Sequence, residues 1–244
     1  MPVFPYSLIE PERPRLGLIV LQSDETLEND FRRLIPRHVS LLVNRIPSGV
    51  DVTPESLGAM REHMTASAGL FPRGYRFDAI GYGCTSGTAE IGADSVSQMV
   101  KQGCETRHVT DPLTALIAAC QSSGVKRLAI LSPYVEVVSD KLRQRLADAG
   151  IETPAFGTFA EPAEARVARI ADEDIVAAGG SLAHGADVDA LFLSCTNLRT
   201  LNVIRPLMAT LSMPVFSSNL VLAWHLLQLT QAAQVPDRPT GLLE

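Results

Sequence analysis

Short apolar runs alternate with longer amphipathic segments along the whole chain. Short apolar runs bounded by turn residues predict buried strands, and apolar residues recurring every three or four positions predict helices. In the first part of the chain, strands are predicted at residues 16–21, 39–46, 78–83 and 108–110. Helices are predicted at residues 25–35, 54–68, 87–102 and 112–121.

The second part of the chain repeats this order of elements. Strands are predicted at residues 127–131, 151–156, 189–193 and 214–217, and helices at residues 135–149, 161–178, 200–211 and 219–232. The helix at 161–178 is expected to be broken near its middle. The segment 127–131 resembles 15–19, at an offset of 127 − 15 = 112 positions. Residues 109–113 and 217–221 also match, because each places a polar cap before an apolar helix.

Strands that alternate with helices imply parallel sheets covered on both faces. We therefore predict an α/β fold of two pseudo-symmetric halves, each a mostly parallel sheet flanked by helices, with the active site at their interface. The N-terminal half is predicted at residues 1–111 and the C-terminal half at 112–218. The segment 219–244 is expected to pack back onto the first half.

The composition narrows the class of protein. The chain has 244 residues, of which 46% are hydrophobic and 20% are charged, which is enough for a substantial core. The net charge of −6 argues against nucleic acid as a partner, and the apolar runs are shorter than a membrane span. Because the N-terminus lacks the apolar core of a signal peptide, we expect a cytoplasmic protein with reduced cysteines. The cysteines have no zinc-site spacing, so no metal is expected.

Two of the four cysteines occur in near-copies of one segment, residues 78–85 and 189–196. Each copy contains Asp-Ala followed by an apolar run that ends in Cys-Thr, and the cysteines Cys84 and Cys195 are 195 − 84 = 111 positions apart. Both follow predicted strands, at the carboxyl ends where parallel sheets bind ligands. If the halves pack face to face, two opposed thiols could add or remove a proton on either face of a small substrate.

The residues next to these cysteines could bind a carboxylate. Thr85 and Ser86 lie where a helix is expected to begin, and a helix N-terminus lowers the pKa of a thiol and attracts anions. Thr196 and Asn197 repeat the arrangement after Cys195. A buried cysteine can also be a simple packing residue, but matched positions in matched segments favour a catalytic role. The other two cysteines, at positions 104 and 120, lack this context and are assigned to packing.

One further candidate site residue follows the first strand of each half. Tyr134 could donate a hydrogen bond to a carboxylate or an enolate, or could be a packing residue. Asp24 could contact substrate or could cap the following helix. Ser218 and Asn219 are interpreted as a helix cap, and no phosphate-binding glycine motif is present in the sequence.

The segments 84–88 and 195–200, together with 132–134 and 217–220, resemble the aspartate/glutamate racemase superfamily, in particular its branch of maleate cis–trans isomerases and arylmalonate decarboxylases. The likeness extends over residues 16–227. It implies an active site between two pseudo-symmetric halves, and it implies no metal and no organic cofactor. Cys84 and Cys195 would be the two opposed thiols.

The resemblance also implies a chemistry. In maleate isomerases the first cysteine attacks the alkene as a thiolate and the second handles the proton, whereas in the racemases two thiols exchange the α-proton. Arylmalonate decarboxylases keep only the second cysteine, so Cys84 argues against decarboxylation. We therefore expect a cofactor-independent isomerase or racemase acting on a small carboxylate. The residues expected to hold this carboxylate are Thr85, Ser86, Tyr134, Thr196 and Asn197.

Several alternatives stay open at this point. They are an amino-acid racemase, a member of the ectoine-utilisation type, a decarboxylase acting through Cys195, and a protein that binds carboxylates without catalysis. Asp24 stands where maleate isomerases have an asparagine, and a second substrate-binding asparagine has no counterpart around residues 161–164. Both departures suit a substrate with a cationic or neutral polar end. Exposed apolar helices could support a homodimer, and neither nucleic acid nor a membrane is expected as a partner.

Overall fold

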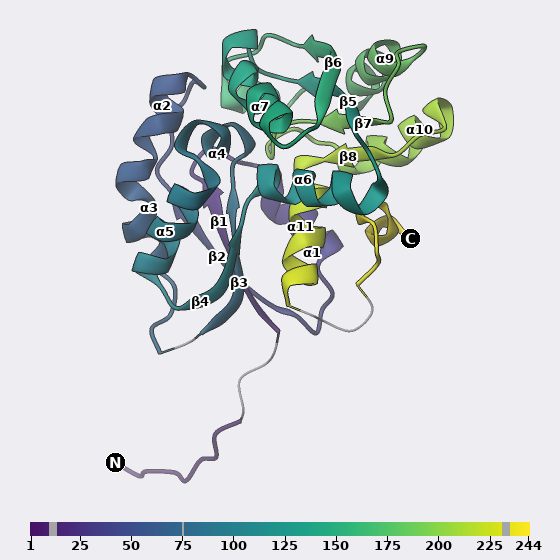
Figure 1. Ribbon diagram of the computed structural model, residues 1–244. Coiled ribbons are helices and arrows are strands. Elements are labelled where there is room, and N and C mark those ends of the chain that lie inside the picture. Colours follow the sequence, from purple (N-terminus) through teal and green to yellow (C-terminus); the bar gives the residue numbers. More distant parts are fainter. Residues whose placement is uncertain (10–13, 75, 231–234) are drawn as a thin grey trace.

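The computed structural model describes residues 1–9, 14–74, 76–230 and 235–244. It contains two four-stranded parallel sheets with the same strand order (Figure 1). The first sheet has the order β2-β1-β3-β4, from β1 (Arg15–Leu21), β2 (Ser40–Ile46), β3 (Phe77–Gly83) and β4 (Thr106–Thr110). The second has the order β6-β5-β7-β8, from β5 (Arg127–Ser132), β6 (Glu152–Thr158), β7 (Ala190–Leu193) and β8 (Val215–Ser217). The predicted α/β class with two equivalent sheets is confirmed.

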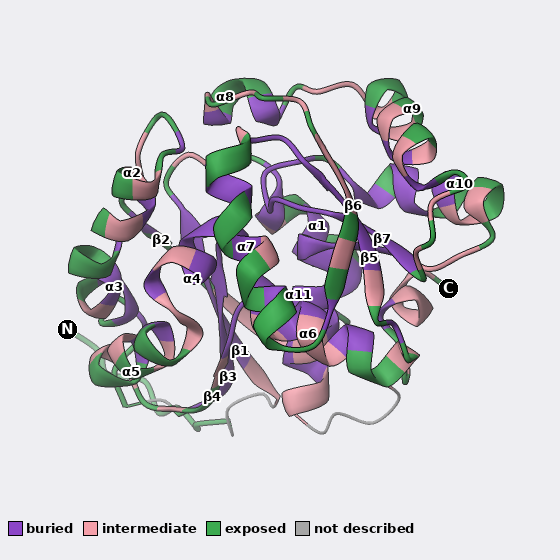
Figure 2. Cartoon of the chain, turned by 45° about the horizontal axis from the view of Figure 1, so that its top comes forward, coloured by how far each residue is buried: buried purple, intermediate pink, exposed green. Residues whose placement is uncertain are grey.

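Helices flank both sheets, and their exposed faces point outward, while the central strands β1, β3, β5 and β7 are buried (Figure 2). In the first part they are α1 (Leu27–Leu34), α2 (Pro54–Ala59), α3 (Arg61–Ala68), α4 (Thr85–Ile91), α5 (Ala93–Gly103) and α6 (Pro112–Ser123). In the second part they are α7 (Glu136–Asp148), α8 (Glu164–Val167), α9 (Asp172–Ala183), α10 (Leu201–Leu211) and α11 (Ser218–Leu229), followed by a 3₁₀ helix (Pro239–Leu243).

The predicted helices differ from the observed ones mainly at breaks. The helix predicted at 54–68 is two helices that meet at Met60. The helix predicted at 87–102 begins earlier, at Thr85, and divides at Gly92, whose φ of 93° is readily adopted only by glycine. The break expected within 161–178 separates α8 from α9. Part of the predicted last helix, residues 231–232, lies outside the described residues.

The aspartates of the repeated Asp-Ala pairs connect the central strands of each sheet by hydrogen bonds. The Oδ2 atom of Asp78 accepts a hydrogen bond from the backbone N–H of Arg15, at 2.9 Å. In the second half, Asp189 accepts from the backbone N–H groups of Lys126 and Arg127, at 2.8 and 2.9 Å. Part of the sequence repeat therefore has a structural cause, since each aspartate joins the third strand of its half to the start of the first.

The helices that follow the fourth strands cross between the halves. α6 and α11 lie side by side in the middle of the molecule (Figure 1). α11 packs on β3 of the first sheet, where a Cβ on Gly81 would lie 3.0 Å from Leu226. α6 places Leu113 in an apolar cluster with Phe192 and Phe216 of the second sheet. The domain boundary between residues 111 and 112 remains a prediction.

In the described part of the chain, no helix is both long and apolar enough to span a bilayer.

Candidate active site

Cys84 connects the end of β3 to the start of α4. Its Sγ atom accepts a hydrogen bond from the backbone N–H of Gly87, at 3.2 Å, and its carbonyl accepts one from the hydroxyl of Thr88, at 2.8 Å. A Cβ on Gly87 would lie only 2.8 Å from this sulfur, so glycine is required for the approach. Thr85 and Ser86, the two predicted hydroxyl donors, are buried in the first turn of α4.

Cys195 follows β7 in a different backbone conformation. Its φ of 100° is rare for any residue except glycine, and the chain does not enter a helix until Leu201. Its Sγ atom accepts a hydrogen bond from the backbone N–H of Asn197, at 3.3 Å, and lies 2.8 Å from the hydroxyl oxygen of Tyr134. The cysteine is therefore held on two sides by residues that the sequence predicted for the site.

The two cysteine turns are joined to each other by hydrogen bonds. The hydroxyl of Thr196 donates to the carbonyl of Gly83, at 3.2 Å, directly before Cys84. The hydroxyl of Ser218 lies 2.8 Å from that of Thr85 and accepts the backbone N–H of Cys195, at 3.0 Å. The fold thus brings the two matched strand ends into one buried cluster.

Ser218 belongs to the cluster that joins the two cysteine turns, which the sequence interpretation missed. The cap of α11 is Ser217, whose hydroxyl accepts from the backbone N–H of Leu220, at 3.3 Å. Asn219 does not cap the helix either, because its side chain donates to the carbonyl of Thr196 and to Asp30, at 2.8 and 2.7 Å. The interpretation of Ser218 and Asn219 as a cap was wrong by one or two positions.

Glu164 is the second residue that sequence reasoning missed. Its carboxylate is buried and accepts the hydroxyl of Tyr134 at Oε1, at 2.6 Å, and the side-chain N–H of Asn197 at Oε2, at 2.7 Å. The family resemblance predicted an asparagine in this segment and gave no role to a glutamate. The signal in the sequence was an acidic residue in a segment where the resemblance predicts a substrate-binding side chain.

Asp24 performs the capping role that was one of its two interpretations. Its Oδ1 atom accepts the backbone N–H groups of Thr26 and Leu27, each at 2.8 Å, at the start of α1. Its Oδ2 atom is buried and has no hydrogen-bond partner among the described residues. A contact between Asp24 and a substrate remains a prediction.

Burial has the largest effect on the pKa values of the thiols and carboxyl groups in this cluster. Loss of solvation raises the pKa of Cys84 to about 12 and raises the pKa of Cys195 well above its usual value. The negative charges of Glu164 and Asp24 raise the pKa of both thiols further, so these four groups share one poorly solvated volume. Burial also raises the pKa of each carboxyl group.

The expected lowering of a thiol pKa at a helix start is wrong for this structure. The hydrogen bond from the Gly87 N–H does lower the pKa of Cys84, but desolvation outweighs it. Both thiols are therefore protonated at neutral pH in the ligand-free molecule.

Two equivalent loops meet where they lead into α2 and α8. Asp51, after β2, and Ala163, after β6, form an antiparallel bridge. The N–H of Val52 donates to the carbonyl of Pro162, at 3.0 Å, and the N–H of Glu164 donates to that of Val50, at 3.2 Å. Contact between the two loops therefore helps to fix Glu164, whose carboxylate accepts from Tyr134 and Asn197 beside Cys195.

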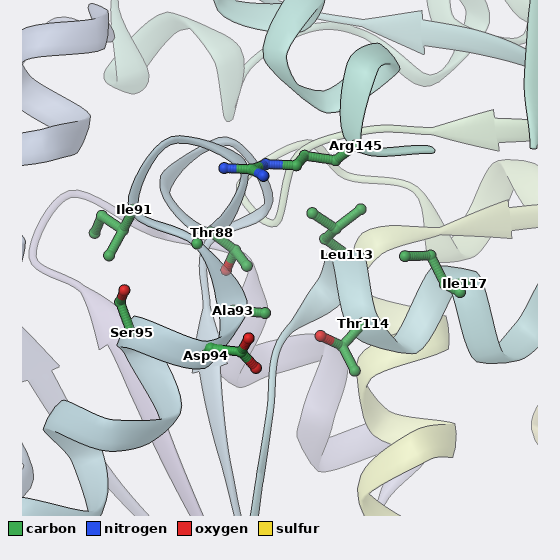
Figure 3. A pocket seen from close by; sticks show the side chains of 10 residues that line it. Thr88, Ile91, Ala93, Asp94, Ser95, Leu113, Thr114, Ile117 and Arg145 are labelled. Atoms are coloured by element: carbon green, nitrogen blue, oxygen red, sulfur yellow. The ribbon is translucent and has the colours of Figure 1, made fainter. Parts of the chain in front are cut away.

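Two cavities lie beside the cluster. A groove of about 150 Å³ borders the start of α1 and is lined by Arg33 and the exposed Arg199. A larger pocket of about 390 Å³ lies among α4, α5, α6 and α7 (Figure 3). There Arg145 reaches from α7 toward Thr88, which bonds to the carbonyl of Cys84, but neither cysteine lines this pocket.

In the residues that the structure describes, no group of three or more histidine, cysteine, aspartate or glutamate side chains is placed to hold a metal ion.

Comparison with known proteins identifies several similar chains. The family model for arylmalonate decarboxylase (Amdase) matches residues 96–241. A maleate isomerase from Nocardia farcinica (strain IFM 10152) is 25% identical over 230 residues, which cover 88% of this chain and 89% of that protein.

Solved structures give the same picture of the fold. The maleate isomerase from Pseudomonas putida S16, in a cysteine-to-alanine variant with maleate, has a TM-score of 0.80 and 23% identity, covering 91% of this chain and 94% of that one. A cysteine-to-serine mutant of the Nocardia farcinica maleate cis–trans isomerase, with a covalently bound succinylcysteine intermediate, has a TM-score of 0.78 and 22% identity, covering 92% and 96%.

Proposed function

Because the chain belongs to the arylmalonate decarboxylase family, we propose that it is a cofactor-independent isomerase or racemase that acts on a small carboxylate through Cys84 and Cys195. The family predicted from the sequence is confirmed. The observation that carries the proposed activity is the direct joining of the two cysteine turns by the Thr196–Gly83 hydrogen bond and by Ser218.

The hydrogen bonds around Tyr134 support different roles for the two thiols. When the tyrosine donates its one proton to Glu164, at 2.6 Å, its oxygen can accept from a protonated Cys195, at 2.8 Å. We therefore give Cys195 the role of the acid. Cys84, which has no such contact with Tyr134, would be the base or nucleophile once substrate binding has generated its thiolate.

For a racemase, the step is an exchange of protons across the substrate. The Cys84 thiolate removes the α-proton, and the electron pair that it leaves is delocalised into the carboxylate as an enediolate. Cys195 then gives its proton to the opposite face of the same carbon. The products are the inverted substrate, a Cys84 thiol and a Cys195 thiolate, so protons and charge balance.

For a cis–trans isomerase, the Cys84 thiolate forms a C–S bond to one alkene carbon, and the neighbouring carbon takes the proton of Cys195. Rotation about the new single bond follows. The Cys195 thiolate then removes a proton and the C–S bond breaks. The succinylcysteine adduct of the Nocardia farcinica variant supports this course in that protein.

The substrate carboxylate would be held by hydroxyl and backbone N–H groups of Thr85, Ser86, Thr196 and Asn197. These residues are buried in the cluster before substrate arrives, and substrate would replace the bonds that the Thr196 hydroxyl and the Asn197 N–H make to Gly83 and Cys195. One such preorganised donor contributes about 3 kcal/mol to stabilising the charge of the transition state.

One observation favours a second candidate, a protein that binds a small carboxylate without catalysis. Both thiols have a raised pKa in the ligand-free structure, so neither is an activated nucleophile before a ligand binds. Catalysis requires that substrate binding generate the thiolate.

The test compares Cys84→Ser and Cys195→Ser with a control, Cys104→Ser, which changes a half-buried cysteine outside the cluster. α-Proton exchange in heavy water and cis–trans conversion are followed by NMR over a panel of small carboxylates. Each site variant should lose turnover by at least about 100-fold, as for loss of a general acid or base, while the control keeps it. Turnover retained in both site variants would refute the two-thiol mechanism, and binding without any turnover by the wild type would establish the second candidate.

A further inference from the structure

The buried Oδ2 atom of Asp24 is unusual because nothing in the described part of the chain satisfies it. Asp24 is 3% exposed, and its other oxygen already caps α1. The positive charge of Arg45 lowers the pKa of Asp24. The Arg45 side chain itself donates to the backbone carbonyls of Leu21 and Asp24 and pairs with Glu28. The Thr196 hydroxyl lies close enough to lower the pKa of Asp24, but its proton is donated to the carbonyl of Gly83. A buried carboxylate oxygen without a partner is costly, so it indicates a group that binds there.

Glu164 occupies the donors that a second substrate carboxylate would need. Tyr134 and Asn197 were both predicted to bind substrate, and each donates to one oxygen of Glu164. No basic side chain among the described residues forms an ion pair with this carboxylate. The protein thus supplies its own carboxyl group on this side of the cluster, and Glu164 has no basic partner among the described residues.

Asn197 holds Glu164 next to the Asp24 turn. Its Oδ1 atom accepts the backbone N–H of Glu25, at 2.8 Å, while its carbonyl accepts the hydroxyl of Thr26, at 2.9 Å. Its Nδ2 group donates to Glu164. One side chain therefore fixes both acidic residues at the same wall of the cluster, beside Cys195.

We propose that Asp24 and Glu164 form a subsite for a positively charged group, so that the substrate is a carboxylate with one amine rather than a dicarboxylate. This inference rests on the proposed function. A second carboxylate would enter beside two buried acids, and its donors Tyr134 and Asn197 are already taken. An ammonium group would instead partner the free Oδ2 atom of Asp24 and the remaining lone pairs of Glu164.

The same arrangement explains how substrate could activate the thiols. Glu164 and Asp24 both raise the pKa of Cys84 and of Cys195. An ammonium group paired with these acids would cancel this part of the increase and would favour thiolate when an amine substrate is bound.

The test measures binding without turnover, by calorimetry at pH 7. The probes are 3-aminopropanoate and 4-aminobutanoate, each compared with the dicarboxylate succinate or glutarate of similar length. The variants are Asp24→Asn and Glu164→Gln, which keep the side-chain shape and remove the charge. The control is Glu25→Gln, because the Glu25 carboxylate is half exposed and pairs with Arg169 at the surface.

The wild type and the control should bind an amine probe at least tenfold more tightly than its matched dicarboxylate. Each site variant should lose most of this preference. Tighter binding of the dicarboxylates by the wild type, no measurable binding of either amine, or an unchanged preference in both site variants would overturn the inference.

The two proposals fail separately. A protein that prefers the amines but never catalyses isomerisation or proton exchange refutes the proposed function alone. A protein that isomerises a dicarboxylate through both cysteines refutes the amine subsite alone.

Discussion

The turns at Cys84 and Cys195 begin from the same sequence pattern and end as different structures. Cys84 has an extended φ of −151° and starts a helix at once, so its sulfur accepts from the backbone of α4. Cys195 has a φ of 100° and is followed by an irregular segment. Its sulfur contacts Tyr134, which in turn contacts Glu164. The duplicated fold therefore keeps the position of the thiol but not its surroundings.

The tyrosines near the two cysteines repeat this contrast. Tyr82 lies in β3, and its hydroxyl donates to the sulfur of Met60, at 3.4 Å, and lowers the pKa of Cys84 by a side-chain hydrogen bond. Tyr134 follows β5 and connects a thiol to a buried carboxylate. Each cysteine therefore has a tyrosine beside it, but only the tyrosine at Cys195 also contacts a carboxylate in the described structure.

The largest effect is expected from Tyr134→Phe. This change removes the only hydroxyl between Cys195 and Glu164 in the described structure, so turnover should fall by at least about 100-fold. The matched comparison is Tyr82→Phe, which should lose less than about tenfold because the Tyr82 hydroxyl contacts a thioether and the Cys84 thiol but does not connect a thiol to a carboxylate. Equal losses in steady-state assays of the two variants would contradict the proposed difference between the thiols.

A pH-dependent effect is expected from Asp30, which accepts from Asn219 and so supports the Cys195 turn. Burial raises its pKa from 3.8 to about 6. The protonated form is thus favoured by folding, and this stabilisation is complete below pH 3.8 and is lost as the pH rises through about 6. The loss amounts to about 3 kcal/mol.

Asp30→Asn should therefore remove this decline from the free energy of unfolding, measured in urea at several pH values. The exposed residue Glu105, paired with Arg76, provides the control Glu105→Gln, which should follow the wild-type curve. An Asp30→Asn curve that declines as steeply as the wild type would refute the role given to this residue.

The Cys84 turn should be the more sensitive of the two to added volume. Gly87→Ala would place a Cβ atom 2.8 Å from the Cys84 sulfur and 2.7 Å from the Tyr82 hydroxyl. Overpacking of this kind should lower the free energy of unfolding by about 1–3 kcal/mol in urea titrations. Gly180→Ala in α9 is the control, since its Cβ would meet nothing within 4 Å and should be neutral or stabilising. Equal stability of the two variants would show that the sulfur is not tightly held.

The smallest effect concerns backbone strain and should have opposite signs at the two cysteines. At Cys195, with φ at 100°, glycine relieves strain, so Cys195→Gly should be more stable than Cys195→Ala by about 1 kcal/mol. At Cys84, with φ at −151°, Cys84→Ala should be more stable than Cys84→Gly by about 0.5–1 kcal/mol. The same order at both sites, in thermal or urea unfolding, would mean that the two backbones are not distinguished by strain.

The sequence alone determined the order of strands and helices, the duplication and the two matched cysteines. These features are readable because periodicity and turn residues act over short distances along the chain. The family resemblance came from the same local segments, 84–88 and 195–200. The helix breaks at Met60 and Gly92 were not predicted, because the apolar pattern of the sequence continues across each of them without a gap.

Only the tertiary structure decided which groups surround the thiols. Glu164 lies 30 positions from Tyr134, and Ser218 lies 133 positions from Thr85, so no local pattern could reveal either pair. The acidity of the cysteines was likewise decided by burial, which depends on how the two halves and their covering loops pack. A helix start next to Cys84 would favour a thiolate in water, but inside this closed cluster the loss of solvation is the stronger effect.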